Sequence, residues 1–244
     1  MIHRKNLIKL IQTNSHRHDS WQVFSDFVEM SAISLSNAVD LAQRDGREAR
    51  YMEIVRRYNK EEASRFAEMF GELVMELESG MTDVLGEVFM EMELGNKWRG
   101  QFFTPYHLCK MMAQMNVDDH MKGMIERNGF IRANEPACGG GAMIIGLAAS
   151  MQQAGINYQQ HLHVVAQDLD HKAVHMTYLQ LSLLHIPAVV IQGNTLALEE
   201  REHWYTPAHI IGGWNMKLRT AERRTAAHHA HAPAQIIVER PAEP

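Results

Sequence analysis

The chain has 244 residues, with 24 Lys and Arg against 29 Asp and Glu, which gives a formal net charge of -5 at pH 7. Its length accommodates one sizeable core or two small domains, and its 45% hydrophobic and 22% charged residues are typical of a soluble globular protein. The acidic balance gives no global support for nucleic-acid binding, so any such binding must depend on local basic patches. No apolar run approaches the roughly 20 residues that a membrane-spanning helix needs.

Two cysteines, Cys109 and Cys138, stand far apart in the sequence. A structural disulfide between them is not expected, because Cys138 lies inside a glycine-rich turn. Residues 1–9 are mixed and charged and lack the apolar core of a secretory signal peptide. These features favour a reducing compartment, and we expect a cytoplasmic protein.

The first 97 residues show helical patterns and no strand candidate. Residues 1–18 hold four basic residues and no acid, and we expect a mobile arm there, with contact to a phosphate backbone as the alternative. Apolar residues recur at helical spacing over 21–41, and a second helix is expected over 47–58. Asn59 is a typical N-cap for a third helix. The interval therefore predicts an all-helical N-terminal domain.

The densest group of basic residues lies between positions 44 and 60. Its members alternate with acidic residues at distances that suit i,i+4 ion pairs on a helix. Such a mixture favours a solvated, internally paired helix face over a DNA-binding footprint. The basic residues are Arg44, Arg47, Arg50, Arg56, Arg57 and Lys60.

From residue 98 onward, strand and helix patterns alternate. A linker over 98–100 leads to Thr104-Pro105, where proline at the first helical position starts a helix. The apolar residues predicted to face inward from this helix are Leu108, Met111, Met112 and Met115. Strands are predicted over 131–135, 162–167 and 187–192, with helices over 142–153 and 169–185. A fourth strand is expected over 208–213.

Strands that alternate with helices predict an α/β fold, in which a parallel sheet is built with right-handed crossovers. Ligands of such sheets lie beyond the carboxyl ends of the strands. Glu135, Asp168 and Asn194 all fall at those ends. The pattern alone therefore predicts one pocket there.

The turn after the first predicted strand holds the consecutive glycines Gly139, Gly140 and Gly141. Glycine suits positions of positive φ and positions where a ligand lies against the backbone, and the next helix directs free amides at that ligand. With Glu135 beside it, the turn suits a nucleotide-like ligand that carries a positive centre. It is neither a P-loop, because no Gly-Lys-Ser/Thr follows, nor a G-x-G-x-x-G turn. A tight strand-to-helix connection without a ligand is the alternative.

Three motifs follow one another along the chain: Gly100-Gln101-Phe102-Phe103-Thr104-Pro105, Glu135-Pro136-Ala137-Cys138-Gly139-Gly140-Gly141 and Val164-Val165-Ala166-Gln167-Asp168. Together they resemble the N6-adenine DNA methyltransferases, and most closely the modification subunits of type I restriction–modification systems. That family carries Gly-Gln-Phe-Tyr/Phe-Thr-Pro, Asp-Pro-Ala-Cys-Gly-Ser-Gly-Gly and a strand ending in Gly-Gln-Glu, in this order. The resemblance covers roughly residues 98–196. It implies a Rossmann-like methyltransferase fold, S-adenosylmethionine (SAM) as cofactor and double-stranded DNA as partner.

The resemblance also assigns tasks to matched residues. Glu135, where the family has Asp, would receive the methionine ammonium of SAM, and Asp168 would accept both ribose hydroxyls, a bidentate use suited to a carboxylate. Asn194, where the family has Asp, would accept a hydrogen bond from the adenine amino group of the cofactor. The other residues implied in cofactor binding are Phe103, Thr104, Pro105, Pro136, Ala137, Cys138, Gly139 and Gly141.

One part of the family's pattern is missing. N6-adenine methyltransferases need Asn/Asp-Pro-Pro-Tyr/Phe after the fourth strand, to hold the adenine amino group and to stack on the flipped base. None of the seven prolines is adjacent to another, so no catalytic residue is assigned. Trp204 and Tyr205 are the aromatic residues of that region that could stack on a base.

The sequence also stops before the later strands and the target-recognition domain of a typical modification subunit, so we expect a truncated or degenerate homologue. We expect a helical domain over 1–97, a SAM-binding methyltransferase-like domain over 98–218 and a disordered tail over 219–244. The tail is rich in histidine, but it lacks the ligand cluster of a designed metal site.

The leading functional hypothesis is a SAM-dependent DNA adenine-N6 methyltransferase that works with a specificity subunit or another protein partner. A non-enzymatic alternative is a SAM-binding regulatory or assembly subunit that is catalytically inactive. A third hypothesis keeps methyl transfer but moves the substrate to RNA or protein. The motif at 100–105 argues against the third, because it belongs to DNA-modifying members of the family.

Overall fold

The computed structural model describes residues 2–92 and 103–230, the side chains of 225–230 excepted. The linker expected over 98–100 and the motif residues Gly100, Gln101 and Phe102 lie outside this part of the chain. No helix in it is long and apolar enough to cross a bilayer.

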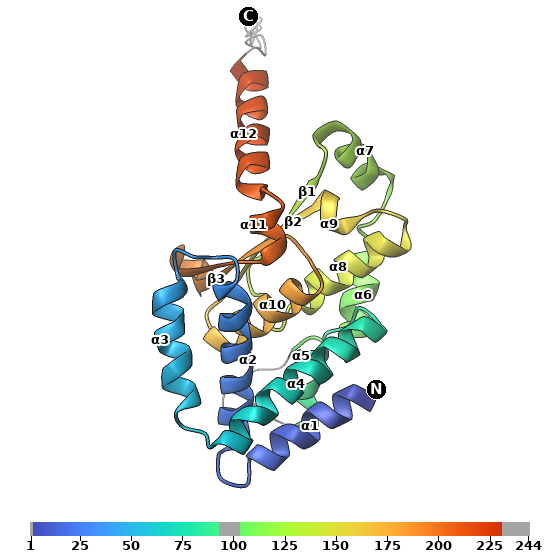
Figure 1. The fold of residues 1–244 in the computed structure, drawn as a ribbon. Coiled ribbons are helices and arrows are strands. Elements are labelled where there is room, and N and C mark those ends of the chain that lie inside the picture. Colours follow the sequence, from blue (N-terminus) through green and yellow to red (C-terminus); the bar gives the residue numbers. More distant parts are fainter. Residues whose placement is uncertain (1, 93–102, 231–244) are drawn as a thin grey trace, which may run out of the picture.

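Every regular element described before residue 93 is a helix. These elements are α1 (Ile2–Asn14), α2 (Ser20–Asn37), α3 (Arg44–Val55), α4 (Lys60–Ser79) and α5 (Val84–Glu91), and they form the lower half of the molecule in Figure 1. Asn59 caps α4 as predicted. Its side chain accepts from the Glu62 amide at 2.9 Å, and the Glu62 carboxylate accepts from the Asn59 amide at 2.8 Å, which together form a capping box.

The mobile arm expected over residues 1–18 was wrong, because α1 is a packed helix. Leu7 and Ile11, one turn apart, are fully buried and lie in the hydrophobic core. Arg4 forms ion pairs with Glu87 and Glu91 of α5. An apolar stripe inside a basic sequence therefore fixes the arm, and Arg4 is turned inward to acids rather than outward to a phosphate backbone.

The second half of the molecule is built on a four-stranded sheet in the order β1 (Ile131–Glu135), β2 (Leu162–Asp168), β3 (Ala188–Asn194) and β4 (Glu199–Tyr205). The first three strands are parallel, with Glu135 opposite Ala166 and Asp168 opposite Gln192. The helices α8 (Ala142–Gln153) and α10 (His171–Leu183) connect them, with the short α9 (Tyr158–His161) before β2. The predicted parallel α/β core is thus present, and the described sheet is mixed only at β4.

The fourth strand expected over 208–213 was wrong. Pro207–Ile211 form the short helix α11, capped by Thr206, whereas β4 is the antiparallel return of a hairpin with β3 through the 3-10 turn η1 (Thr195–Ala197). The sequence hides this strand, because β4 is charged and most of its side chains are exposed. The hairpin needs a glycine at 193, since a Cβ there would lie 2.0 Å from the Glu199 carbonyl oxygen.

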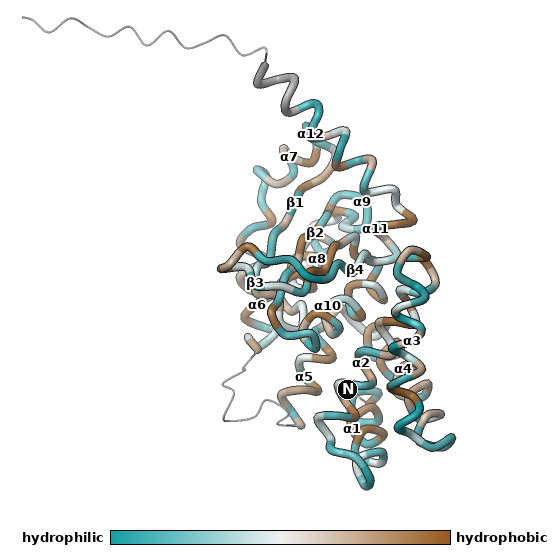
Figure 2. The backbone as a smooth tube through the Cα atoms, turned by 90° about the vertical axis from the view of Figure 1, so that its left-hand side faces the viewer, coloured by the Kyte–Doolittle hydropathy of each residue, from teal (hydrophilic) through white to brown (hydrophobic). Residues whose placement is uncertain are grey.

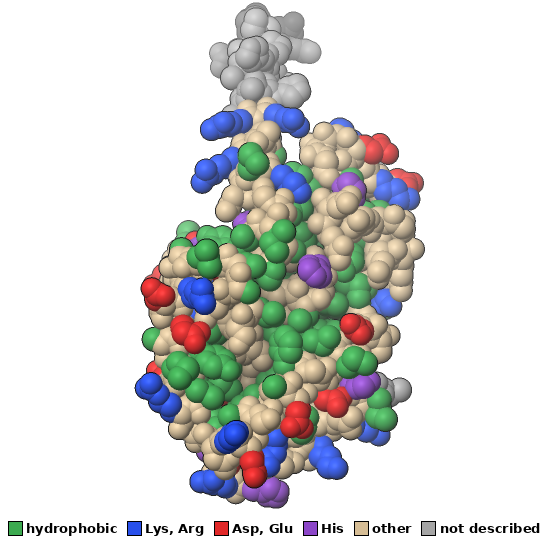
Figure 3. Space-filling model, in the orientation of Figure 1, with side chains coloured by type: hydrophobic (Ala, Val, Ile, Leu, Met, Phe, Trp, Pro, Cys, Tyr) green, Lys and Arg blue, Asp and Glu red, His purple; other side chains and the backbone are tan. Residues whose placement is uncertain are grey.

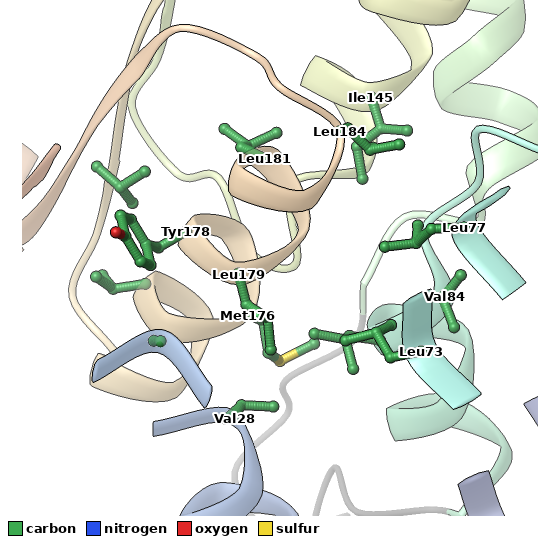
Figure 4. Packing of buried hydrophobic residues seen from close by; sticks show 14 of the residues in the cluster. Val28, Leu73, Leu77, Val84, Ile145, Met176, Tyr178, Leu179, Leu181 and Leu184 are labelled. Carbon is green, nitrogen blue, oxygen red and sulfur yellow. The ribbon is translucent and has the colours of Figure 1, made fainter. Parts of the chain in front are cut away.

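One hydrophobic core runs through both halves, and α10 is its centre (Figure 4). All residues from Ala173 to Ser182 are buried. The helix packs on β2 and β3 and also on α2 and α5. This core spans the domain boundary predicted at residue 97, and the helical half is a cover for α10, which itself packs on the sheet.

The helix α6 (Tyr106–Gln114) packs against α8 with its small residues, not with its methionines. Cys109 and Ala113 are buried, and a Cβ on Gly146 would meet the Cys109 backbone at 3.3 Å. The residues predicted to face inward are exposed instead: Leu108 40%, Met111 54%, Met112 48% and Met115 79%. Close helix contact through Gly146 selects the face with small side chains, which overrides the apolar stripe. The following helix, α7 (Asp119–Asn128), leads into β1.

The tail also differs from expectation, because residues 219–230 belong to α12 (Trp214–Ala230) rather than to a disordered segment. Trp214 anchors this helix. Its ring is 1% exposed and lies 5.1 Å from the Phe130 ring and 5.2 Å from the His163 ring. The expectation for 231–244 concerns residues outside the described chain.

The predicted pairing inside the basic cluster between positions 44 and 60 is present in part, through Glu53, and other members pair with acids before residue 44. Arg50 contacts Glu29 at 2.6 Å, and Arg57 contacts Glu53 at 3.2 Å. Arg47 is the member that joins the two halves of the molecule. It donates to Ser36, to Asp40 at 2.9 Å and to the His203 carbonyl at 2.9 Å, and it lies 3.9 Å over the Trp204 ring.

Replacement of Arg47 with Ala should therefore lower the free energy of unfolding by about 2–3 kcal/mol, because the buried Ser36 and the half-buried Asp40 and His203 lose a charged donor. Chemical denaturation measures the change. The exposed Arg44, which forms no ion pair with a described residue, supplies the control. An Arg44→Ala variant should change stability by less than about 0.5 kcal/mol, and equal losses in the two variants would contradict the role of Arg47.

Candidate functional site

The glycine turn lies between β1 and α8, at the carboxyl edge of the sheet. Gly139 and Gly141 have φ of +54° and +93°, a conformation that residues with a Cβ rarely adopt. The Cys138 amide donates to the Gln167 carbonyl of β2 at 2.9 Å, and the Gly141 amide donates to the Cys138 carbonyl at 2.8 Å. These hydrogen bonds fix the turn against the neighbouring strand.

Asp168, at the end of β2, also holds the turn. One carboxylate oxygen accepts from the Gly139 amide at 2.9 Å, and the other accepts from the Asp170 amide at 2.9 Å. Each oxygen of a carboxylate has two lone-pair directions, so each oxygen can still accept one hydroxyl. Asp168 therefore has a structural task that its sequence position does not reveal.

The described part of the upstream motif lies over the same turn. A Cβ on Gly139 would come within 2.9 Å of the Phe103 ring, which itself packs on Phe89 with ring centroids 5.0 Å apart. Thr104 and Pro105 follow as exposed residues that lead into α6. The structure thus brings Phe103 against Gly139, two residues that the sequence analysis assigned to one pocket from motifs 36 positions apart.

Glu135 is a half-buried carboxylate at the end of β1. It accepts a hydrogen bond from the Ala137 amide, and burial raises its pKa above the usual value, an effect that this hydrogen bond opposes. Glu135 forms no ion pair with any cation in the described residues. Burial of a carboxylate is unfavourable unless it is paired, and within residues 2–92 and 103–230 this acid has no cation beside it.

Asn194, at the end of β3, differs from its expected role. Its side-chain oxygen accepts from the Leu196 and Ala197 amides at 3.1 and 3.2 Å and so caps η1. That oxygen is therefore engaged, while its amide nitrogen makes no hydrogen bond to a described residue. The next residue, Thr195, donates to the Pro136 carbonyl at 2.7 Å, which ties this loop to the glycine turn.

A buried network of hydrogen bonds, which the sequence did not predict, lies behind the turn. The Gln180 amide donates to Asp83 at 2.7 Å and to the Gly140 carbonyl at 2.8 Å, and its oxygen accepts from the Leu85 amide at 3.1 Å. Thr177, one turn earlier on α10, donates to the Gly139 carbonyl at 2.8 Å. Polar residues at positions 177 and 180, between apolar residues of a helix, are the signal in the sequence, but their partners are not readable from it.

The Cys138 thiol belongs to this buried layer. Its residue is 6% exposed, and burial raises the pKa of the thiol to about 12. A protonated thiol is a poor nucleophile. Burial of Cys138 therefore disfavours the reactive thiolate form.

The two aromatic residues considered for base stacking lie away from this pocket. Trp204 is 4% exposed and is covered by Arg47. Tyr205 pairs with Val189, near the amino end of β3, and so lies at the opposite edge of the sheet from Asn194. Neither ring lies beside the glycine turn. Neither of the two aromatic residues suggested by the sequence is therefore placed to stack on a base at this pocket.

With this geometry in place, a family model described as N-6 DNA methylase matches residues 81–221, more than half of the chain. The protein belongs to the N-6 DNA methylase family. A search of curated proteins found no match. The matched interval begins before Asp83 and ends within α12, so it includes part of the helical cover as well as the sheet.

Proposed function

We propose that this protein binds SAM at the glycine turn and is a DNA adenine-N6 methyltransferase homologue, similar to the modification subunit of a type I restriction–modification system. The observation that carries the proposal is Glu135, a half-buried carboxylate with a raised pKa and no cation among the described residues. The methionine part of SAM presents an ammonium group, which supplies the missing partner. Gly139 and Gly141, which follow Glu135 in the turn, carry no side chain and take positive φ.

The described residues fit SAM in further respects. Asp168 keeps one free lone pair on each oxygen, which suits two ribose hydroxyls. Because the Asn194 oxygen caps η1, we assign its free amide group to donate to a ring nitrogen of the cofactor's adenine. SAM, when bound, supplies the electrophilic methyl group; the chain's residues bind and orient it.

Methyl transfer itself needs an acceptor for the target amino group, and here a second function has specific support. The Asn/Asp-Pro-Pro-Tyr/Phe motif is absent from the sequence, and Trp204 is buried under Arg47. Both observations favour a catalytically inactive, SAM-binding regulatory or assembly subunit. In that case a specificity subunit or another protein partner would complete the system.

Calorimetric titration of the full chain with SAM tests the proposal. We expect micromolar binding for the parent chain and a loss of about 1.5–3 kcal/mol for Asp168→Ala, since charge-assisted hydrogen bonds are worth that much. Equal binding by both proteins would remove Asp168 from the site. No binding by the parent would leave the turn as a structural connection only.

If SAM binds, an assay with methyl-labelled SAM and unmethylated duplex DNA separates the two functions. Label in adenine supports the methyltransferase. SAM binding without transfer to DNA, alone or with the product of a neighbouring specificity gene, supports the inactive subunit. Transfer to RNA or protein but not to DNA would contradict both.

A further inference from the structure

The helix α12 is a projecting element with a distribution of charge unlike that of the rest of the molecule. Figures 1 and 2 agree that it leaves the body at the end opposite to α1 and α4. Within the described chain, the ion pair of Glu222 with Arg132 at 3.3 Å is the furthest point along α12 that a hydrogen bond or ion pair ties to the body. The helix continues to Ala230.

Four cations lie on α12 within two turns: Lys217, Arg219, Arg223 and Arg224, all exposed. The three arginines form no ion pair with any described residue, and Lys217 lies 4.4 Å over the Trp214 ring. Glu222, the acid among them, is already paired with Arg132. Arg47, Arg50 and Arg57 are matched with acids, whereas the three arginines of α12 have no acid partner among the described residues, on a protein of net charge -5.

These cations lie on the solvent side of the helix. Trp214, Leu218 and Ala221 are buried or half-buried, and their i, i+4, i+7 spacing places them on one face. At about 100° per residue, Arg219 and Arg223 fall on the far side from that face, with Lys217 and Arg224 on its flank. Figure 3 shows basic side chains on both sides of the projecting helix.

We propose that α12 is a binding element for the phosphate backbone of duplex DNA, outside the cofactor pocket. The choice of DNA as the partner rests on the proposed function, and the inference adds which element of the chain contacts the DNA. The four cations span roughly 10 Å of helix, and duplex DNA presents a negative charge about every 1.7 Å of its axis. Exposed cations on a projecting surface are the chemistry that releases counterions from such a duplex.

The position of α12 in the fold places the proposed DNA contact relative to the cofactor pocket. The helix starts beside Phe130, Arg132 and His163, at the amino ends of β1 and β2, whereas the glycine turn lies at their carboxyl ends. The contact on α12 is therefore separate from the cofactor pocket. Phosphate contacts position a protein on DNA but carry no sequence information, so binding through α12 is independent of sequence.

The test measures binding of the full chain to an unmethylated 30-base-pair duplex of mixed sequence, by fluorescence anisotropy at several salt concentrations. The variant carries Arg219→Gln, Arg223→Gln and Arg224→Gln, all exposed positions where glutamine suits a helix. We expect at least a tenfold loss of affinity near 0.1 M salt, and a salt slope lower by about 2–3, at 0.9 per phosphate contact.

A matched control keeps the same change of net charge on other exposed cations: Lys5→Gln, Lys9→Gln and Lys60→Gln. This control should bind DNA nearly as the parent does. An equal loss in both triple variants, or no loss in either, would overturn the proposal. Displacement of the duplex by polyglutamate as effectively as by DNA, charge for charge, would also overturn it in favour of an acidic protein partner.

Calorimetry with SAM keeps this inference separate from the proposed function. The arginine variant should bind SAM as tightly as the parent, because α12 lies at the other end of the strands. If the parent binds DNA through α12 but does not bind SAM, the cofactor proposal fails and the DNA contact stands. If SAM binds and the arginine variant keeps full DNA affinity, the DNA contact fails alone.

Discussion

Replacement of Glu135 with Gln should weaken SAM binding by about 2–5 kcal/mol, roughly thirtyfold or more, because it removes the charged partner of a partly desolvated ammonium. The substitution keeps the size of the side chain, and the amide oxygen can still accept from the Ala137 amide that now bonds to Glu135. Calorimetric titration at constant pH measures the loss. Glu126, an exposed acid on α7, provides the control, since Glu126→Gln should leave the affinity unchanged.

The same residue predicts how binding depends on pH. Burial raises the pKa of Glu135 in the free protein, and a bound ammonium favours the ionised carboxylate. Binding should therefore release protons, and SAM affinity should rise as the pH increases through the raised pKa of Glu135 and then level off. The Glu135→Gln variant should lose this dependence. A parent whose affinity is flat across this range would exclude Glu135 as the ammonium partner.

Stability should move in the opposite direction from binding. A carboxyl group whose pKa is higher in the folded state than in the unfolded state contributes stability at low pH, and this contribution is lost as the pH rises through the folded-state pKa. Near neutral pH and without SAM, Glu135→Gln should accordingly be somewhat more stable than the parent. Thermal unfolding tests this sign independently of any ligand. A less stable variant would mean that Glu135 is held by a partner in the free protein.

The sequence was informative where structure depends on neighbouring residues. Gly139 and Gly141 take the positive φ that a turn after a strand requires, and Asn59 caps its helix. The βα alternation placed Glu135, Asp168 and Asn194 at strand ends that the parallel register brings to one edge of the sheet. Periods and caps are local, so they can be read without knowledge of the fold.

The predictions were wrong where contacts between residues far apart in the sequence determine the structure. The strand β4 is charged and gains its place by pairing with β3, and α6 faces inward with Cys109 because Gly146 allows close approach. The Asn194 oxygen, which the motif suggested as an acceptor for the cofactor, accepts hydrogen bonds from its own loop. Such competition between a ligand role and a structural role is invisible in a motif, where only the residue type is seen.

The contact of Asp83 with Gln180 joins residues 97 positions apart, and it is the link by which the helical cover supports the glycine turn. Asp83 is 3% exposed, and it also accepts from the Gly86 amide at 2.9 Å as the cap of α5. Gln180 completes the link, because its one amide group bonds to Asp83, Leu85 and Gly140. The turn is therefore positioned from behind by a residue that no ligand touches.

Replacement of Gln180 with Met, which preserves length but not hydrogen bonding, should lower the free energy of unfolding by about 3–4 kcal/mol, since three buried polar groups lose a partner. The exposed Gln152 on α8 gives the matched control, and Gln152→Met should change stability by less than about 0.5 kcal/mol. Denaturant unfolding compares the two. Under conditions where the Gln180 variant is folded, its SAM affinity should also fall, because the Gly140 carbonyl is no longer held.

A second variant tests the hydrogen bond itself rather than the packing. Gln180→Glu places a carboxyl group against Asp83, whose pKa burial already raises, and at neutral pH the two acids should destabilise the protein further. As the pH falls, one carboxyl group becomes protonated and can donate to the other, so this variant should regain stability relative to Gln180→Met. Because Met has no titratable group, the difference between the two variants reports the titration of the carboxyl groups buried at positions 83 and 180. Parallel pH profiles for the two variants would show that Gln180 acts through its volume alone.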